Sequence, residues 1–93
     1  PRIAGFEMEM QPFQNEQLKL RLYVPEKLDE LTINLYDQNN IHVLEILSKN
    51  DISEGYLEEV LQLDEIPSGQ FQAVISAVQG DEPYTDIKEI YFP

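Results

Sequence analysis

The sequence contains no cysteine and no tryptophan, one histidine, and only six lysines and arginines in 93 residues. Without cysteine, the chain has no disulfide, thiolate metal ligand or thiol nucleophile. Eighteen aspartates and glutamates give a net charge of −12, which opposes binding to phosphate backbones and anionic lipids. The longest nearly apolar run, residues 73–78, is far shorter than the roughly 20 residues of a membrane helix. We therefore expect no nucleic-acid partner and no membrane insertion.

The length fits one domain with a single core, because chains split into domains only beyond roughly 250 residues. A hydrophobic share of 42% predicts that this domain folds. The chain begins at Pro1 without an initiating methionine or the features of a signal peptide, and it ends in a strand-like stretch. We therefore expect residues 1–93 to be one domain excised from a longer protein.

Alternation of apolar and polar residues is the dominant pattern, and its period of two predicts half-buried strands. It is clearest in residues 18–24, 31–35 and 71–77. Weaker alternation predicts four further strands over residues 3–10, 41–47, 57–63 and 84–92. The turn between the third and fourth strands, Asp-Gln-Asn-Asn at residues 37–40, is short enough for a hairpin, so these two strands are expected to pair directly.

Residues 51–62 permit two interpretations. Four apolar residues lie at helical spacing: Ile52, Tyr56, Val60 and Leu63. However, Gly55 would destabilise a helix interior by about 1 kcal/mol, and the rest of the chain is typical of β structure. We prefer a strand with Leu57, Leu61 and Leu63 facing inward, and a single helical turn near residues 51–55 is compatible with either interpretation.

Seven short strands predict an all-β fold, an Ig-like or fibronectin type III-like antiparallel β-sandwich. The residues expected on its two inner faces are Phe6, Met8, Leu18, Leu20, Leu22, Ile33, Leu35, Leu61, Leu63, Phe71, Ala73 and Ile75. The cysteine and tryptophan core of antibody domains is absent. A small open barrel is the alternative that the alternation leaves open.

Two stretches resemble segments of small bacterial Ig-like domains. Residues 17–47, QLKLRLYVPEKLDELTINLYDQNNIHVLEIL, resemble their order of a strand ending in proline, a spacer, a strand ending in Tyr-Asp, a turn and a further strand. Residues 63–75, LDEIPSGQFQAVI, resemble their Leu-Pro-x-Gly segment, with Pro67, Gly69 and Phe71 in matching places. Similar domains include that of the flagellar hook-capping protein and the C-terminal sorting domains of type IX secretion cargo. The resemblance implies a spacer or protein-interaction module of a bacterial extracytoplasmic or secreted protein.

The residues do not predict an enzyme. His42 is flanked by apolar residues, so a histidine at a sheet face or edge is the preferred interpretation over a Ser-His-Asp relay or a metal ligand. The acidic pairs Asp64–Glu65 and Asp81–Glu82 would serve glycoside hydrolysis only across a cleft, and we interpret them as solvated surface.

We expect no cofactor. A structural calcium ion is the minor alternative, because calcium takes oxygen ligands. Its candidate ligands, Asp51, Asp81, Glu82 and Asp86, are only loosely grouped along the chain. Solvated surface carboxylates are the preferred interpretation.

Two surfaces are candidates for binding. An exposed strand edge, at residues 84–92 or 3–10, has unpaired backbone groups that can add a strand from a protein partner or a neighbouring domain. Its candidate residues are Tyr84, Ile87 and Ile90. The alternative is a carbohydrate-binding face built on exposed tyrosines. The candidates are Tyr23, Tyr36, Tyr56, Tyr84 and Tyr91, of which Tyr23 and Tyr36 fall on the outward register of their strands.

A charge ladder is also expected on the outer surface. Lys19 and Arg21 share the outward register of one strand, and Glu7 and Glu9 share that of another. If these strands pair, opposite charges face each other and help to fix the register.

Overall fold

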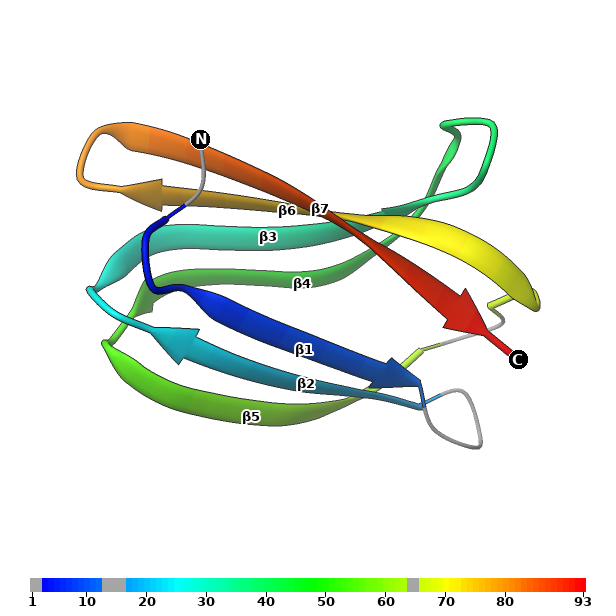
Figure 1. Cartoon of the computed structure of the whole chain (residues 1–93), viewed down its shortest axis with the longest axis horizontal. Coiled ribbons are helices and arrows are strands. Elements are labelled where there is room, and N and C mark those ends of the chain that lie inside the picture. The colour runs from blue at the N-terminus through cyan, green and yellow to red at the C-terminus, as the bar shows by residue number, and fades with distance from the viewer. Residues whose placement is uncertain (1–2, 13–16, 64–65) are drawn as a thin grey trace.

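The structure is a computed structural model, and it describes residues 3–12, 17–63 and 66–93. The described residues form seven strands and no helix (Figure 1). The strands are β1 (Glu7–Pro12), β2 (Gln17–Val24), β3 (Leu28–Tyr36), β4 (His42–Ile52), β5 (Gly55–Gln62), β6 (Gly69–Gln79) and β7 (Glu82–Phe92). The seven predicted strands are therefore confirmed. Most are longer than predicted, and β1 begins at Glu7 rather than at Ile3.

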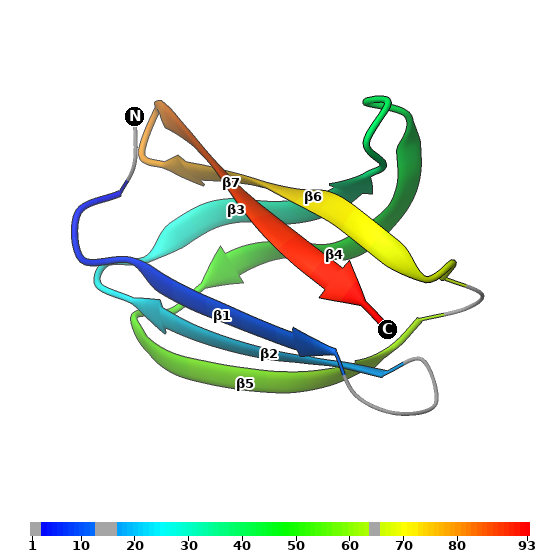
Figure 2. The ribbon, with the colours of Figure 1, turned by 45° about the vertical axis from the view of Figure 1, so that its right-hand side comes forward.

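The strands form two antiparallel sheets packed face to face. The smaller sheet has the order β1-β2-β5, and the larger has the order β4-β3-β6-β7. Figure 2 shows the smaller sheet below the larger one. The predicted β-sandwich is confirmed, and the open barrel is wrong for this chain. In the constant-type immunoglobulin arrangement the fourth strand belongs to the sheet of the first, second and fifth strands, whereas here β4 pairs with β3.

The core lies between the sheets and follows from the alternation of side chains along each strand. Ten of the twelve predicted core residues are buried, and Phe6 and Leu61 are half-buried against them. Nine further residues are buried that were not among the twelve predicted core residues. These are Val24, Leu28, Leu31, Ile46, Leu47, Ile52, Ala77, Ile90 and Phe92.

A β-bulge in β4 explains why two adjacent residues are both buried, against the alternation of buried and exposed positions. Ile46 and Leu47 are adjacent on β4, and both are buried. The register between β3 and β4 shifts between Ile33 and Asn34, so one extra residue of β4 is accommodated there. A bulge turns two successive side chains toward the same face, which a period of two does not predict.

The hairpin predicted between the third and fourth strands is confirmed. β3 and β4 pair directly, and the Asp37 carboxylate accepts hydrogen bonds from the backbone amides of Asn39 (2.8 Å) and Ile41 (3.0 Å). Asn40 has a φ of 63°, in the left-handed region that asparagine tolerates better than most residues. The side chain of Asp37 therefore fixes the turn that the sequence indicated.

The ambiguous segment is extended. β4 continues to Ile52 and β5 begins at Gly55, so a helical turn near residues 51–55 is wrong. Positive φ angles at Asp51 (52°) and Gly55 (117°) reverse the chain between the larger and the smaller sheet. Leu57 and Leu61 are half-buried against the core and Leu63 is buried, as the strand interpretation requires.

The expected charge ladder is present on the outer face of the smaller sheet. Glu9 lies opposite Arg21 in the register of β1 and β2, with 3.9 Å between the Arg21 Nη1 and Glu9 Oε2 atoms. Glu58 of β5 extends the row, with its Oε2 atom 3.6 Å from Arg21 Nε and its Oε1 atom 3.2 Å from Lys19 Nζ. Glu7 was expected to face a basic residue in this ladder, but it lies opposite Tyr23.

Candidate interaction site

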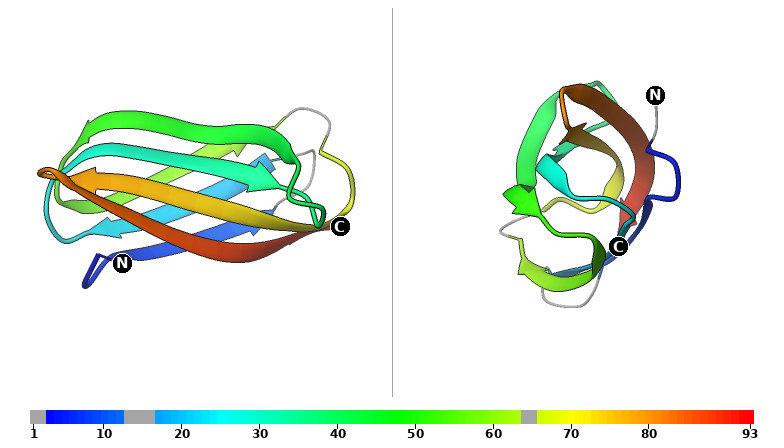
Figure 3. Two further views of the ribbon diagram at one scale, coloured as in Figure 1. Left: turned by 90° about the horizontal axis from the view of Figure 1, so that it is seen from above. Right: turned by 90° about the vertical axis from the view of Figure 1, so that its left-hand side faces the viewer.

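The sandwich has two open sides, each bordered by one edge strand from either sheet. β4 and β5 border one side, while β1 and β7 border the other, as seen along the strands in the right panel of Figure 3. On the β4 and β5 side, Lys49 and Glu59 form an ion pair between the two sheets. These two inward-facing charges therefore close that side.

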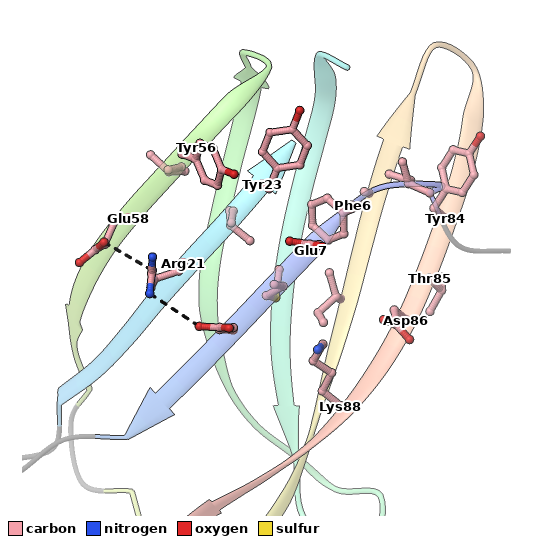
Figure 4. Close-up of a pocket in the computed structure, with 17 residues that line it drawn as sticks. Phe6, Glu7, Arg21, Tyr23, Tyr56, Glu58, Tyr84, Thr85, Asp86 and Lys88 are labelled. Carbon is pink, nitrogen blue, oxygen red and sulfur yellow. Dashed lines mark ion pairs between the residues drawn. The ribbon is translucent and has the colours of Figure 1, made fainter. Parts of the chain in front are cut away.

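The side between β1 and β7 contains a cleft of about 770 Å³, shown in Figure 4. Its apolar lining comes from both sheets and comprises Ile3, Phe6, Met8, Leu22, Leu57, Ile75 and Ala77. Tyr84, Thr85, Asp86 and Lys88 line it from β7. The cleft extends over the outer face of the smaller sheet, where Arg21, Tyr23 and Tyr56 also border it. This cleft thus lies between two strand edges.

The burial of the side chains alternates along β7. Tyr84, Asp86 and Lys88 are half-buried on the side that faces the cleft, followed by the buried Ile90 and Phe92. The odd-numbered residues are exposed on the outer face, and Ile87 and Tyr91 have exposed fractions of 54% and 59%. One strand therefore combines inward charges with outward apolar groups.

The backbone groups of β7 alternate in the same way. β6 and β7 are joined by the two-residue connection Gly80-Asp81, and Gln79 lies opposite Glu82 at its base. The residues flanking a two-residue hairpin loop form a hydrogen-bonded pair, so the even-numbered residues of β7 bond to β6. The odd-numbered residues direct their amides to the free edge. Two observations agree with this direction of the odd-numbered amides. Pro83, which has no amide hydrogen, occupies an odd position. The Ile87 amide donates to the Asp86 carboxylate at 2.9 Å and not to β6.

The structure separates the three candidate residues on the predicted strand edge. Tyr84 is half-buried in the cleft, and Ile87 is exposed on the outer face. Ile90 is only 5% exposed and lies in the core. Ile87 and Ile90 are three residues apart, so they point to opposite faces of an extended strand. The accessible part of this edge is therefore Ile87 with its odd-numbered neighbours, and Ile90 does not belong to it.

The two tyrosines of the predicted carbohydrate face lie on different sheets. Tyr23 on β2 packs against Tyr56 on β5, with 4.8 Å between the ring centroids. Tyr36 on β3 packs edge-on against His42 on β4 at 5.3 Å. Tyr23 and Tyr36 therefore do not form one platform. Tyr56 is among the five candidate tyrosines, but its position opposite Tyr23 depends on the pairing of β2 with β5, which the sequence does not predict.

His42 lies at the start of β4, at the exposed end of the larger sheet. Its Nε2 atom is 2.8 Å from Asn34 Oδ1, and its ring contacts Tyr36. These neighbours place it at a strand face, as expected from the sequence.

The acidic residues considered as metal ligands or catalytic groups lie in several places. Asp51 is paired with Lys27 at 3.5 Å, whereas Asp81 and Glu82 lie at the β6–β7 hairpin. The described residues contain no group of three His, Asp or Glu side chains close enough to hold a metal ion. Asp64 and Glu65 lie outside the described residues.

Within residues 3–12, 17–63 and 66–93 there is no helix with the length and apolarity needed to traverse a bilayer. Comparison with protein-family models and with curated proteins finds no match for this chain. The interpretation of the site therefore rests on its geometry.

Proposed function

We propose that this chain is a non-catalytic Ig-like accessory module that binds protein by adding a strand to the free edge of β7. The observation that carries the proposal is the composition of this edge. β7 has eleven residues, and its odd-numbered amides are not used by β6. The exposed Ile87 and Tyr91 lie along it. An added strand gains backbone hydrogen bonds from such an edge and side-chain contacts from its alternating faces.

The other three edges are less suited to strand addition. β1 has only six residues. β4 has two register irregularities and presents the inward-facing Lys49, and both features hinder pairing with a further strand. On β5, Glu58 and Glu59 are both engaged in ion pairs. β7 is therefore the preferred edge.

The wider role follows from the resemblance of residues 17–47 and 63–75 to bacterial Ig-like domains. We propose that the module belongs to a bacterial extracytoplasmic or surface protein and acts there as an interaction domain or spacer. Its partner is a protein or a neighbouring domain. The net charge of −12 keeps such a module soluble and favours partners that are basic overall.

To test the proposal, peptides that bind the whole chain are selected from a displayed library of random peptides. The binding site of the selected peptides is then mapped on the chain by amide hydrogen exchange. Strand addition is expected to slow exchange at the odd-numbered amides of β7, Thr85 and Glu89 above all, because the Ile87 amide already donates to the Asp86 carboxylate. Ile87→Pro removes an amide hydrogen that β6 does not use, so binding should fall at least about tenfold while the fold is kept.

Ile87→Thr is the matched control, because it changes the same side chain and retains the amide. Ile90→Pro is unsuitable, since Ile90 is buried and its amide bonds to β6. Peptides that bind tightly but leave the exchange of the β7 amides unchanged would contradict the proposal, as would equal binding by Ile87→Pro and Ile87→Thr.

Glycan binding is the second candidate, and one observation favours a different site from the one expected. Tyr56 is 85% exposed beside Tyr23, and the charged row of Arg21 and Glu58 is adjacent. Exposed rings stack on sugar faces, and charged groups bind hydroxyls. Retardation in polysaccharide gels tests this candidate. Tyr56→Ala should abolish retention and Tyr36→Ala on the other sheet should not, whereas equal loss in both variants would contradict it.

A further inference from the structure

We infer that the strand received by β7 carries an acidic side chain opposite Lys88 and a large apolar side chain four residues away, opposite Tyr84. The inference rests on the proposed use of the β7 edge and names the chemistry of the partner strand. It follows from the two ends of the cleft beside β7, of which one is apolar and the other is cationic.

The cleft is apolar at the end that holds Tyr84. Figure 4 shows Phe6, which precedes β1, near Tyr84. Ile3, Phe6 and Tyr84 pack against the core but are only half-buried. Ala77 lies opposite Tyr84 on β6 and also lines the cleft, where its methyl group occupies little space. Because covering partly exposed apolar surface is favourable, this end accepts a large apolar side chain.

The other end of the cleft carries a cation without an acidic partner. Lys88 is half-buried on the side of β7 that faces the cleft, and its ammonium group forms no ion pair or hydrogen bond with any described residue. The other lysines and arginines among the described residues, which are Lys19, Arg21, Lys27 and Lys49, are all in ion pairs. Lys88 is therefore the cation that is left for a partner.

Asp86 is the neighbour of Lys88 on the same face of β7, but it is already engaged. Its carboxylate accepts the Ile87 amide at 2.9 Å, and it takes part in a further interaction. Asp86 therefore places no requirement of its own on the added strand.

An added strand would take the Lys88 ammonium group further from water. Burying a charge without an opposite partner is strongly unfavourable. Residues directly opposite each other on paired strands point to the same face, so the residue opposite Lys88 also projects into the cleft. An aspartate or glutamate at that position supplies the partner, whereas a base would oppose two like charges.

The two ends of the cleft match the spacing of one extended strand. Tyr84 and Lys88 are four residues apart on the same face of β7, which corresponds to about 14 Å. Two residues of an added strand that are also four apart have the same separation and share one face, in either direction of the strand. The amides of Thr85 and Glu89 face the free edge and are available to the added backbone, whereas the Ile87 amide is already engaged.

The net charge of −12 acts against acids elsewhere in the partner. General attraction to this chain would favour bases at every position of a bound peptide. The inference instead requires an acid at one position, so the two effects are distinguishable in the sequences of the selected peptides.

Parallel selection of random displayed peptides against the whole chain and against Lys88→Glu tests the inference. Peptides that bind the unchanged chain and protect the β7 amides should carry an acid four residues from a large apolar residue. Peptides selected against Lys88→Glu should carry a base at the position of the acid. Lys27→Glu is the matched control, because it has the same change of charge away from β7 and should select the same peptides as the unchanged chain.

One peptide from the selection isolates the contact with Lys88. Replacing its acid by the corresponding amide should weaken binding to the unchanged chain at least about tenfold. The same replacement should change binding to Lys88→Met by less than about twofold, because the charged partner is then absent. Replacing the apolar residue of the peptide by serine should weaken binding to both proteins.

Peptides that protect the β7 amides but show no acid at a fixed position would overturn the inference and leave the proposed function intact. An equal loss for the amide peptide with the unchanged chain and with Lys88→Met would do the same. Octanoate is the probe for a small amphipathic acid, and octanoate that binds the cleft as tightly as the selected peptides would overturn the inference of a strand. If no peptide protects the β7 amides, the proposed function fails together with the inference.

Discussion

Lys49 of β4 and Glu59 of β5 form an ion pair that joins the two sheets at one open side of the sandwich. Their side chains retain exposed fractions of 35% and 24%, so the pair is partly screened by solvent. Glu59→Gln leaves Lys49 without its partner and should lower the free energy of unfolding by about 1 kcal/mol, between the values for exposed and buried pairs. Urea unfolding measures the change.

A double-mutant cycle isolates this interaction from the loss of packing. Lys49→Met combined with Glu59→Gln should cost less than the sum of the two single substitutions, by about 0.5 to 1 kcal/mol. Strictly additive losses would mean that the two side chains do not stabilise each other.

Ile33 and Val60 are both β-branched strand residues, but only the first is buried. Ile33 is fully buried on β3, whereas Val60 on β5 is 56% exposed. Ile33→Ala should destabilise the fold by about 2 to 5 kcal/mol through lost burial and a residual cavity. Val60→Ala should change stability by less than about 0.5 kcal/mol, and thermal or urea unfolding compares the two variants. A similar loss in both would contradict the sandwich core.

Asn40 and Asn39 are neighbours in the β3–β4 turn, and Asn40 has a positive φ of 63°. A β-branched residue is strained in this region of backbone space. Asn40→Val should therefore destabilise the fold by about 1 to 2 kcal/mol. Asn39→Val, without the positive φ, is the matched control and should have the smaller effect in the same unfolding experiment. The opposite order would contradict the observed turn.

Arg21 lies between Glu9 and Glu58 in the row across β1, β2 and β5. Because it is 59% exposed, its ion pairs should contribute at most about 1 kcal/mol. Arg21→Gln should therefore lower the free energy of unfolding only slightly. Arg21→Glu places three glutamates in one row and should lower the free energy of unfolding by more, as measured by urea unfolding. The difference between the two variants should shrink in about 1 M NaCl, where the Debye length is near 3 Å. A difference that is independent of salt would indicate a cause other than charge.

The alternation of residues 18–24 was sufficient to predict β2 and its buried face, because side chains in a strand point alternately to the two faces of a sheet. The short turn at residues 37–40 was sufficient to predict the pairing of β3 with β4. The candidate site was only partly predictable. Residues 84–92 were correctly identified as a strand, but Ile87 and Ile90 were grouped together although a spacing of three places them on opposite faces.

By itself, the sequence determined the number of strands, most of the core and the outward register of the charged residues on β1 and β2. These properties depend on local alternation, turn composition and net charge, all of which are present in the order of the residues. Apart from the β3–β4 hairpin, the tertiary structure alone decided which strands are neighbours, because the other predicted segments carried no signal for their partners. It therefore also decided that Tyr23 meets Tyr56, that Lys49 meets Glu59 and that the outer edge of β7 has no partner strand among the described residues.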